Sequence, residues 1–66
     1  MLWFGSETGA VEFDPIRKRV IRTFPSGENG MTKGRVFDIE QAPNGAVWFR
    51  TNRGLSRLEN DQLEEI

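Results

Sequence analysis

Short runs of apolar residues alternating with polar ones extend along the whole chain, and polar, glycine-bearing turns separate them. No segment places apolar side chains three and four residues apart over several turns, as an amphipathic helix requires. Alternation with a period of two is the pattern of β-strands. We therefore expect an all-β fold with antiparallel strands at Leu2–Ser6, Ala10–Asp14, Arg19–Phe24, Val36–Gln41, Ala46–Thr51, Gly54–Asn60 and Gln62–Ile66.

Two of the predicted strands, Leu2–Ser6 and Ala46–Thr51, carry apolar residues in succession. Such a run predicts burial on both faces, as in a strand that lies between two neighbouring sheets. The strand Val36–Gln41 alternates instead, and this alternation places Phe37 and Ile39 on one face.

The strand Ala10–Asp14 alternates as well, with Val11 and Phe13 on one face and Glu12 and Asp14 on the other. Alternating carboxylates on a strand are typical of a solvent-exposed face. A carboxylate pair for glycoside hydrolysis or calcium binding, at Glu12/Asp14 or at Glu64/Glu65, is the alternative interpretation. We favour the solvated face.

The turns between the predicted strands contain residues suited to tight hairpins. Asn44-Gly45 favours a type I′ hairpin, in which both central residues have positive φ. In Glu7–Gly9 and in Asn52–Gly54, the glycine stands where a three-residue hairpin takes a left-handed residue. The turns therefore agree with antiparallel pairing of consecutive strands.

The chain repeats itself with an offset of 45 residues, the separation of Trp3 and Trp48. At this offset the following residues also align in character: Leu2 with Val47, Phe4 with Phe49, Ser6 with Thr51, Gly9 with Gly54, Phe13 with Leu58 and Asp14 with Glu59. A repeat of about 40–50 residues without helical periodicity is typical of four-stranded propeller blades.

Two segments, LWFGSETGAVEFDP and VFDIEQAPNGAVWFRTNRGLSRLEND, resemble the two-component regulator propeller repeat. ENGM, at residues 28–31, resembles the link between blades in that family. The chain departs from the family pattern at Arg50, where glycine is usual and where Gly5 keeps it in the first copy. It also lacks the usual acidic residue at Gln41-Ala42-Pro43.

The resemblance implies antiparallel β-propeller blades, in which residues 1–25 form strands B, C and D of one blade. Residues 26–35 would link the blades, and residues 36–66 would form strands A to D of the next. Because closed propellers have about four to eight blades, about one and three-quarter blades make a propeller fragment. Trp3, Phe4, Trp48 and Phe49 would then be poorly covered. The expected partners are neighbouring blades of a parent chain, or other copies through self-association.

Composition excludes several classes of function. Histidine and cysteine are absent, which rules out a Ser-His-Asp triad and a Cys-His pair within this chain, and the sequence predicts no metal site and no cofactor. The net charge of −1 gives no reason to expect nucleic acid, and no apolar run is long enough to insert into a membrane. We interpret the basic residues at Arg17–Arg19 and Arg22 as a solvated hairpin. The chain is therefore expected not to be an enzyme.

The candidate binding residues lie in loops that a propeller brings to one end of the ring. These are Lys33, Arg35, Asn52 and Arg53, with Glu7 nearby. Loops on a rigid scaffold are where binding residues concentrate. Such a cluster suits an anionic or polyhydroxylated ligand such as an oligosaccharide, and an ordinary solvated loop is the alternative.

The two tryptophans have large flat faces on which a sugar can stack. Since Trp3 and Trp48 lie inside runs predicted to be buried, we interpret them as core residues.

The resemblance implies a non-catalytic role in signalling. It predicts a fragment of the extracytoplasmic, periplasmic sensor or ligand-recognition propeller of a two-component protein such as a hybrid histidine kinase. One alternative is a fragment of a propeller lyase of the streptogramin-inactivating type, whose histidine would have to come from elsewhere. The other is a structural or protein-interaction module.

Overall fold

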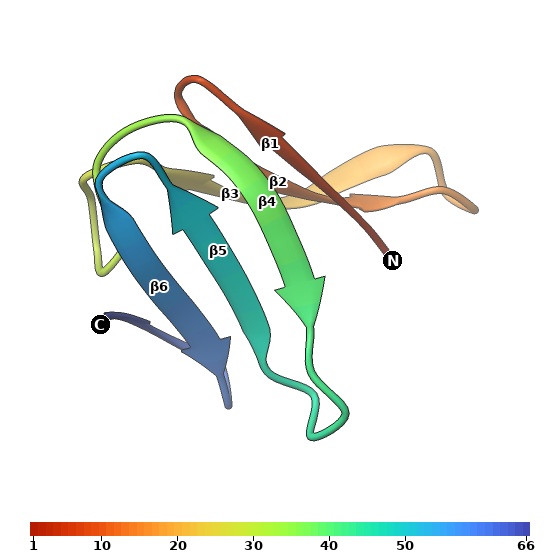
Figure 1. Ribbon diagram of the computed structural model, residues 1–66. Coiled ribbons are helices and arrows are strands. Elements are labelled where there is room, and N and C mark those ends of the chain that lie inside the picture. Colours follow the sequence, from red (N-terminus) through yellow and green to blue (C-terminus); the bar gives the residue numbers. More distant parts are fainter.

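The computed structural model describes residues 1–66 and contains two antiparallel β-sheets and no helix (Figure 1). The all-β prediction is confirmed, and each strand begins and ends within one residue of its predicted bounds. The first sheet contains β1 (Leu2–Ser6), β2 (Gly9–Asp14) and β3 (Arg19–Pro25). The second sheet contains β4 (Val36–Gln41), β5 (Val47–Thr51), β6 (Gly54–Glu59) and β7 (Gln62–Glu65).

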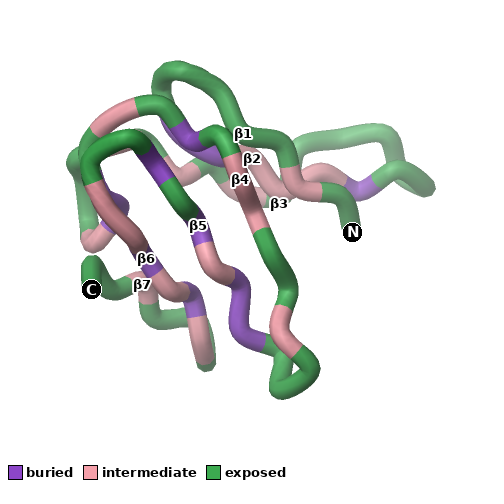
Figure 2. The backbone as a smooth tube through the Cα atoms, in the orientation of Figure 1, coloured by how far each residue is buried: buried purple, intermediate pink, exposed green.

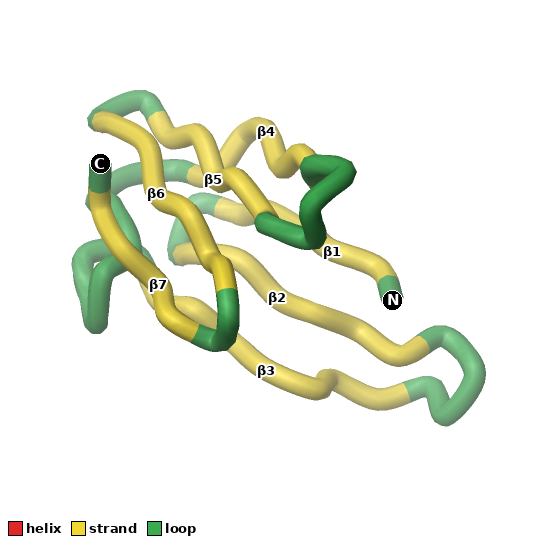
Figure 3. Tube along the Cα trace, turned by 90° about the horizontal axis from the view of Figure 1, so that it is seen from below, coloured by secondary structure: helices red, strands yellow, loops and turns green.

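In both sheets, each strand pairs with the strand that follows it in the chain, so that each sheet is a simple meander. Residues 26–35 connect β3 to β4, and the view in Figure 3 shows the strands of each sheet in succession. One face of the first sheet packs against one face of the second, and we call these the inner faces. The opposite faces, which have no partner sheet, are called the outer faces.

The core lies between the two inner faces and centres on Phe49, whose side chain is fully buried. The Trp3 ring on β1 meets the Phe49 ring edge-on, with the ring centroids 5.4 Å apart, and Phe24 on β3 lies 5.9 Å from Phe49. The other buried members of this core are Ala10, Met31, Val36, Val47 and Leu58. The expectation that Phe49 would be poorly covered is therefore wrong, because β1 and β3 cover it.

The expected burial of β1 on both faces is also wrong. Leu2 is 46% exposed and Phe4 is 53% exposed, because they lie on the outer face of the first sheet. Figure 2 shows β1 as mostly exposed, whereas buried segments are frequent along β5 and β6. Phe37 is likewise 56% exposed, since the register of β4 against β5 shifts between Val36 and Asp38 and removes Phe37 from the buried face.

The alternation in β2 is present, but its two faces are reversed from the expectation. Val11 and Phe13 lie on the outer face, whereas Glu12 lies on the inner face and is bound by Arg22 of β3, with Nε 2.9 Å from Oε1. Asp14 is buried because its Oδ1 accepts the backbone N–H groups of the next turn. The interpretation of these carboxylates as a solvated face is therefore wrong.

The turn types also differ from the prediction. Asn44 does not have positive φ, and the β4–β5 connection closes through a hydrogen bond from the Gly45 N–H to the Ala42 carbonyl. Among the hairpin turns, the one with positive φ at two consecutive positions is Asn60-Asp61, between β6 and β7. The turns before Gly9 and Gly54 contain two residues each, and Gly54 does not have positive φ.

The two sheets approach each other closely at Gly5 of β1. A Cβ atom at this position would lie 2.5 Å from the Val36 carbonyl oxygen of β4. Because the obstacle is backbone, the strands can accommodate a side chain here only by moving apart.

Replacing Gly5 by alanine is therefore expected to reduce the free energy of unfolding by about 1–3 kcal/mol, the usual cost of overpacking. Urea denaturation followed by circular dichroism would measure this change. The control is Ser6→Ala, which alters an exposed residue of the same strand and should cost less than about 1 kcal/mol. Equal effects of the two variants would show that the sheets are not in close contact at Gly5.

Candidate functional site

The turns at one end of the molecule gather the predicted binding residues. Lys33 and Arg35 belong to the link between the sheets, and Asn52 and Arg53 form the turn between β5 and β6. We call this region the loop mouth and define it as residues 26–35 together with the turns Glu7–Gly9 and Asn52–Gly54.

Hydrogen bonds join the link to the β5–β6 turn. The Arg35 N–H donates to Asn52 Oδ1 at 3.0 Å, and the Thr51 hydroxyl donates to the Lys33 carbonyl at 2.7 Å. The same hydroxyl oxygen accepts the N–H groups of Arg53 and Gly54. The backbone of Lys33, Arg35 and Arg53 is thus held in one place with the side chain of Asn52. The three cationic side chains remain exposed.

Within the loop mouth, Glu7 is tied to the link only through its neighbour Thr8. The Ser26 N–H donates to the Thr8 carbonyl at 2.9 Å, and the Ser26 hydroxyl donates to the Gly34 carbonyl at 2.6 Å. These bonds hold the β1–β2 turn beside the link. The Glu7 carboxylate itself is exposed and forms no ion pair.

The cationic side chains of the loop mouth form no ion pairs either, since all five ion pairs of the molecule involve other residues. A hollow of about 250 Å³ opens beside Lys33 and Arg53, and Glu65 of β7 contributes to its wall. Two unpaired cations against one carboxylate give the hollow a net positive lining. This charge suits a ligand that carries anionic oxygens.

A buried hydroxyl without a partner lies in the wall of the same hollow. Thr32 is 1% exposed, and its Oγ1 forms no hydrogen bond. Buried polar groups are rarely left unpaired, because the loss of hydration costs about 1–3 kcal/mol. Thr32 Oγ1 is therefore a free hydrogen-bonding group at the base of the loop mouth.

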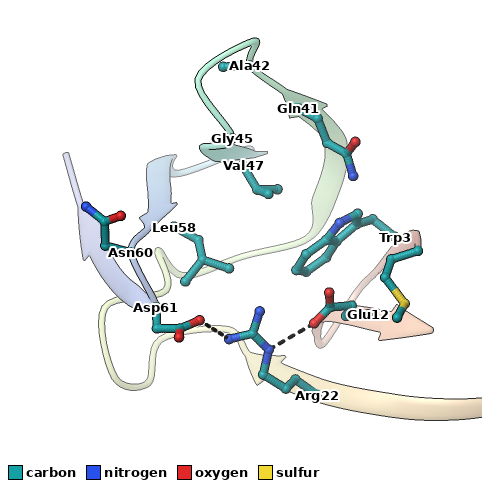
Figure 4. A pocket seen from close by; sticks show the side chains of 11 residues that line it. Trp3, Glu12, Arg22, Gln41, Ala42, Gly45, Val47, Leu58, Asn60 and Asp61 are labelled. Atoms are coloured by element: carbon teal, nitrogen blue, oxygen red, sulfur yellow. Dashed lines mark hydrogen bonds and ion pairs between the residues drawn. The ribbon is translucent and has the colours of Figure 1, made fainter. Parts of the chain in front are cut away.

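A second, larger cleft of about 480 Å³ opens between the sheets, and turns from the opposite end of the strands contribute to its wall (Figure 4). Arg22 reaches across it and binds both Glu12 of the first sheet and Asp61 of the β6–β7 turn, at 2.9 and 3.2 Å. Trp3 lines the same cleft with Val47 and Leu58. Sequence reasoning missed this inter-sheet cleft, although Glu12 and Arg22 stand opposite each other in the β2–β3 register.

The two tryptophans lie in different surroundings. Trp3 stacks on Phe24 with the ring centroids 5.8 Å apart and contacts Phe49, so that it is part of the core. Trp48 lies on the outer face of the second sheet, half-buried under the guanidinium of Arg57 at 5.6 Å. The interpretation as a core residue therefore holds for Trp3 and is wrong for Trp48, because no second layer covers that face.

The side chains that line the two hollows can form ion pairs and hydrogen bonds. No group of three or more acidic, histidine or cysteine side chains could hold a metal ion. No helix in the structure has the length and apolar character needed to cross a membrane. Comparison with known family models, curated proteins and solved structures finds no match for this chain.

Proposed function

We propose that the chain is a non-catalytic recognition module built from propeller-type blades. Its stacked sheets position the loop mouth, which binds an anionic, polyhydroxylated ligand such as an acidic oligosaccharide. The observation that carries this proposal is a hollow lined by Lys33 and Arg53, neither of which forms an ion pair. Arg35, which also forms no ion pair, is held beside the β5–β6 turn by the hydrogen bond from its N–H to Asn52 Oδ1. Cations on a rigid scaffold recognise carboxylate or sulfate oxygens without first breaking an existing ion pair.

The blade assignment is supported by the 45-residue repeat, by the meander order of both sheets and by their face-to-face packing. The resemblance to the two-component regulator propeller repeat supports the wider role. In that role the module belongs to an extracytoplasmic sensor, and ligand binding biases the conformation of a signalling protein.

The test is a titration of the chain with tetragalacturonate, an acidic oligosaccharide, followed by backbone amide shifts in nuclear magnetic resonance spectra. We expect the amides of Gly34, Arg35 and Arg53 to shift. The triple variant Lys33→Gln, Arg35→Gln, Arg53→Gln should bind at least about tenfold more weakly, because each charge-assisted hydrogen bond contributes about 1.5–3 kcal/mol. Maltotetraose, a neutral oligosaccharide of equal length, should bind more weakly than the acidic one.

A matched control removes the same number of charges elsewhere. The triple variant Arg17→Gln, Lys18→Gln, Arg19→Gln alters the exposed β2–β3 turn and the first residue of β3. It should leave the binding of tetragalacturonate within about twofold of the unaltered chain. An equal loss in both triple variants would mean that only net charge matters, and the loop mouth would then not be the site.

A further inference from the structure

The packing of the first sheet against the second is a template for a second interface of the same kind. In this internal interface, Trp3 projects from the inner face of the first sheet onto Phe49 of the second. Ala10 and Phe24 surround the contact on the side of Trp3. A sheet with a projecting tryptophan therefore fits a sheet with a phenylalanine at its centre.

The outer face of the first sheet is built like the buried inner face of the second. The 45-residue offset relates three outer-face residues, Leu2, Phe4 and Phe13, to Val47, Phe49 and Leu58. Val47, Phe49 and Leu58 are 7%, 0% and 5% exposed, whereas Leu2 and Phe4 are about half exposed. Phe4 and Phe13 already form an edge-to-face pair with ring centroids 6.2 Å apart. This outer face therefore has the composition of a core without the layer that would cover it.

The outer face of the second sheet carries the complementary tryptophan. Trp48 is the repeat equivalent of Trp3, and it lies on β5 opposite Arg57 of β6. Leu55 is the equivalent of Ala10 and is half-buried on the same face. The outer face of the first sheet thus presents a phenylalanine, Phe4, and the outer face of the second sheet presents a tryptophan, Trp48. These are the two partners that meet in the internal interface.

One position at which the two repeats differ indicates which sheet can cover Trp48. In the internal interface Gly5 lies directly under Val36 of β4, and the equivalent of Gly5 in the second sheet is Arg50. A four-stranded sheet docked in the same way would bring its first strand onto the Arg50 side chain. In the first sheet β1 is an edge strand, so that none of the three strands of this sheet would lie against Arg50.

Charge favours the same pairing. Residues 1–25 contain four basic and three acidic side chains, a net charge of +1. Residues 36–66 contain three basic and six acidic side chains, a net charge of −3. The first sheet of one copy therefore attracts the second sheet of another, whereas two second sheets repel each other.

We propose that copies of this chain associate head to tail, with the outer face of the second sheet of one copy packed on the outer face of the first sheet of the next. Trp48 of one copy then covers Phe4 of its neighbour, as Trp3 covers Phe49 within the chain. The two surfaces in this contact are different, so the interface is heterologous. This association is independent of the ligand proposed for the loop mouth.

The test is sedimentation velocity of the 66-residue chain and of two variants, Phe4→Glu and Trp48→Glu. The unaltered chain should sediment as oligomers, whereas each variant alone should sediment as a monomer because one of its two faces is blocked. An equimolar mixture of the variants should form dimers, since each contributes the face that the other has lost. Assembly should proceed no further than the dimer.

The other outcomes overturn the proposal. A monomeric unaltered chain at high concentration, or a mixture of variants that stays monomeric, would exclude the head-to-tail contact. Oligomers of Trp48→Glu would show that two first sheets pair with each other instead. Circular dichroism checks that both variants fold. Val20→Lys provides a second way to disrupt the outer face of the first sheet, because Val20 of β3 is 52% exposed on that face. Val20→Lys alone should also sediment as a monomer. An equimolar mixture of Val20→Lys and Trp48→Glu should form dimers.

Discussion

Replacing Phe49 by alanine is expected to cost about 3–5 kcal/mol of folding free energy, the largest effect of any single substitution that we expect in this chain. The Phe49 side chain is fully buried and contacts the rings of Trp3 and Phe24, so its removal leaves a cavity where the two sheets meet. Small domains are stable by only about 5–15 kcal/mol, and a chain of this length is expected at the low end. Thermal unfolding followed by far-ultraviolet circular dichroism would measure the loss.

Phe37→Ala provides a matched control, because the same ring is removed from a residue that is 56% exposed. We expect this variant to lie within about 1 kcal/mol of the unaltered chain. Similar losses in the two variants would contradict the assignment of Phe49 to the centre of the core.

Replacing Ser56 by alanine is expected to be the second most damaging change, at about 2 kcal/mol or more. The Ser56 hydroxyl is fully buried, accepts the Thr32 N–H at 2.8 Å and donates to the Gly30 carbonyl at 2.9 Å. Alanine would leave both backbone groups buried without partners, and each unpaired group costs about 1–3 kcal/mol. Urea denaturation would measure the loss of folding free energy. Amide hydrogen exchange should show a loss of protection at the Thr32 N–H, which loses its hydrogen-bond acceptor.

An exposed serine supplies the comparison for this variant. Ser6→Ala removes a hydroxyl whose hydrogen bonds stay within its own turn and are open to water. Its cost should be less than half that of Ser56→Ala. If the two costs were the same, the bridge from β6 to the link would contribute nothing to stability.

The strands could be predicted from the sequence because alternation and turn residues are local properties. The bounds of β1 and β4 agree with the structure, and the other strands differ by single residues at their ends. Which face of a strand is buried could not be predicted in the same way. Glu12 lies on the inner face, where Arg22 binds it, and Val11 lies on the outer face. Which of the two faces is buried depends on the position of the partner sheet.

Turn geometry shows a similar limit. Asn44-Gly45 and Asn60-Asp61 both contain residues that tolerate positive φ, yet only the second has it at both positions. The number of residues between the paired strand ends decides this, since β4 and β5 are joined by a longer loop than β6 and β7. The sequence shows the types of residue in a turn, but it does not show at which residue the pairing of the two strands ends.

Of the two candidate sites, the loop mouth could be predicted from the sequence and the inter-sheet cleft could not. The meander order alone brings Lys33, Arg35, Asn52 and Arg53 to one end, so sequence reasoning could group them. The inter-sheet cleft depends on the distance between two sheets at their other end, which no local pattern encodes. The contact of Arg22 with Asp61, 39 residues away, is visible only in the folded chain.

The link between the sheets is unequally attached to them. Four hydrogen bonds attach the link to the second sheet: two with the Ser56 hydroxyl, one from the Thr51 hydroxyl and one to Asn52 Oδ1. Apart from its junction with β3, the link is attached to the first sheet by a single backbone hydrogen bond, from Ser26 to Thr8. Met31 of the link is also part of the core. The link is therefore structurally part of the second sheet, and a displacement of the first sheet would break fewer hydrogen bonds of the link than a displacement of the second.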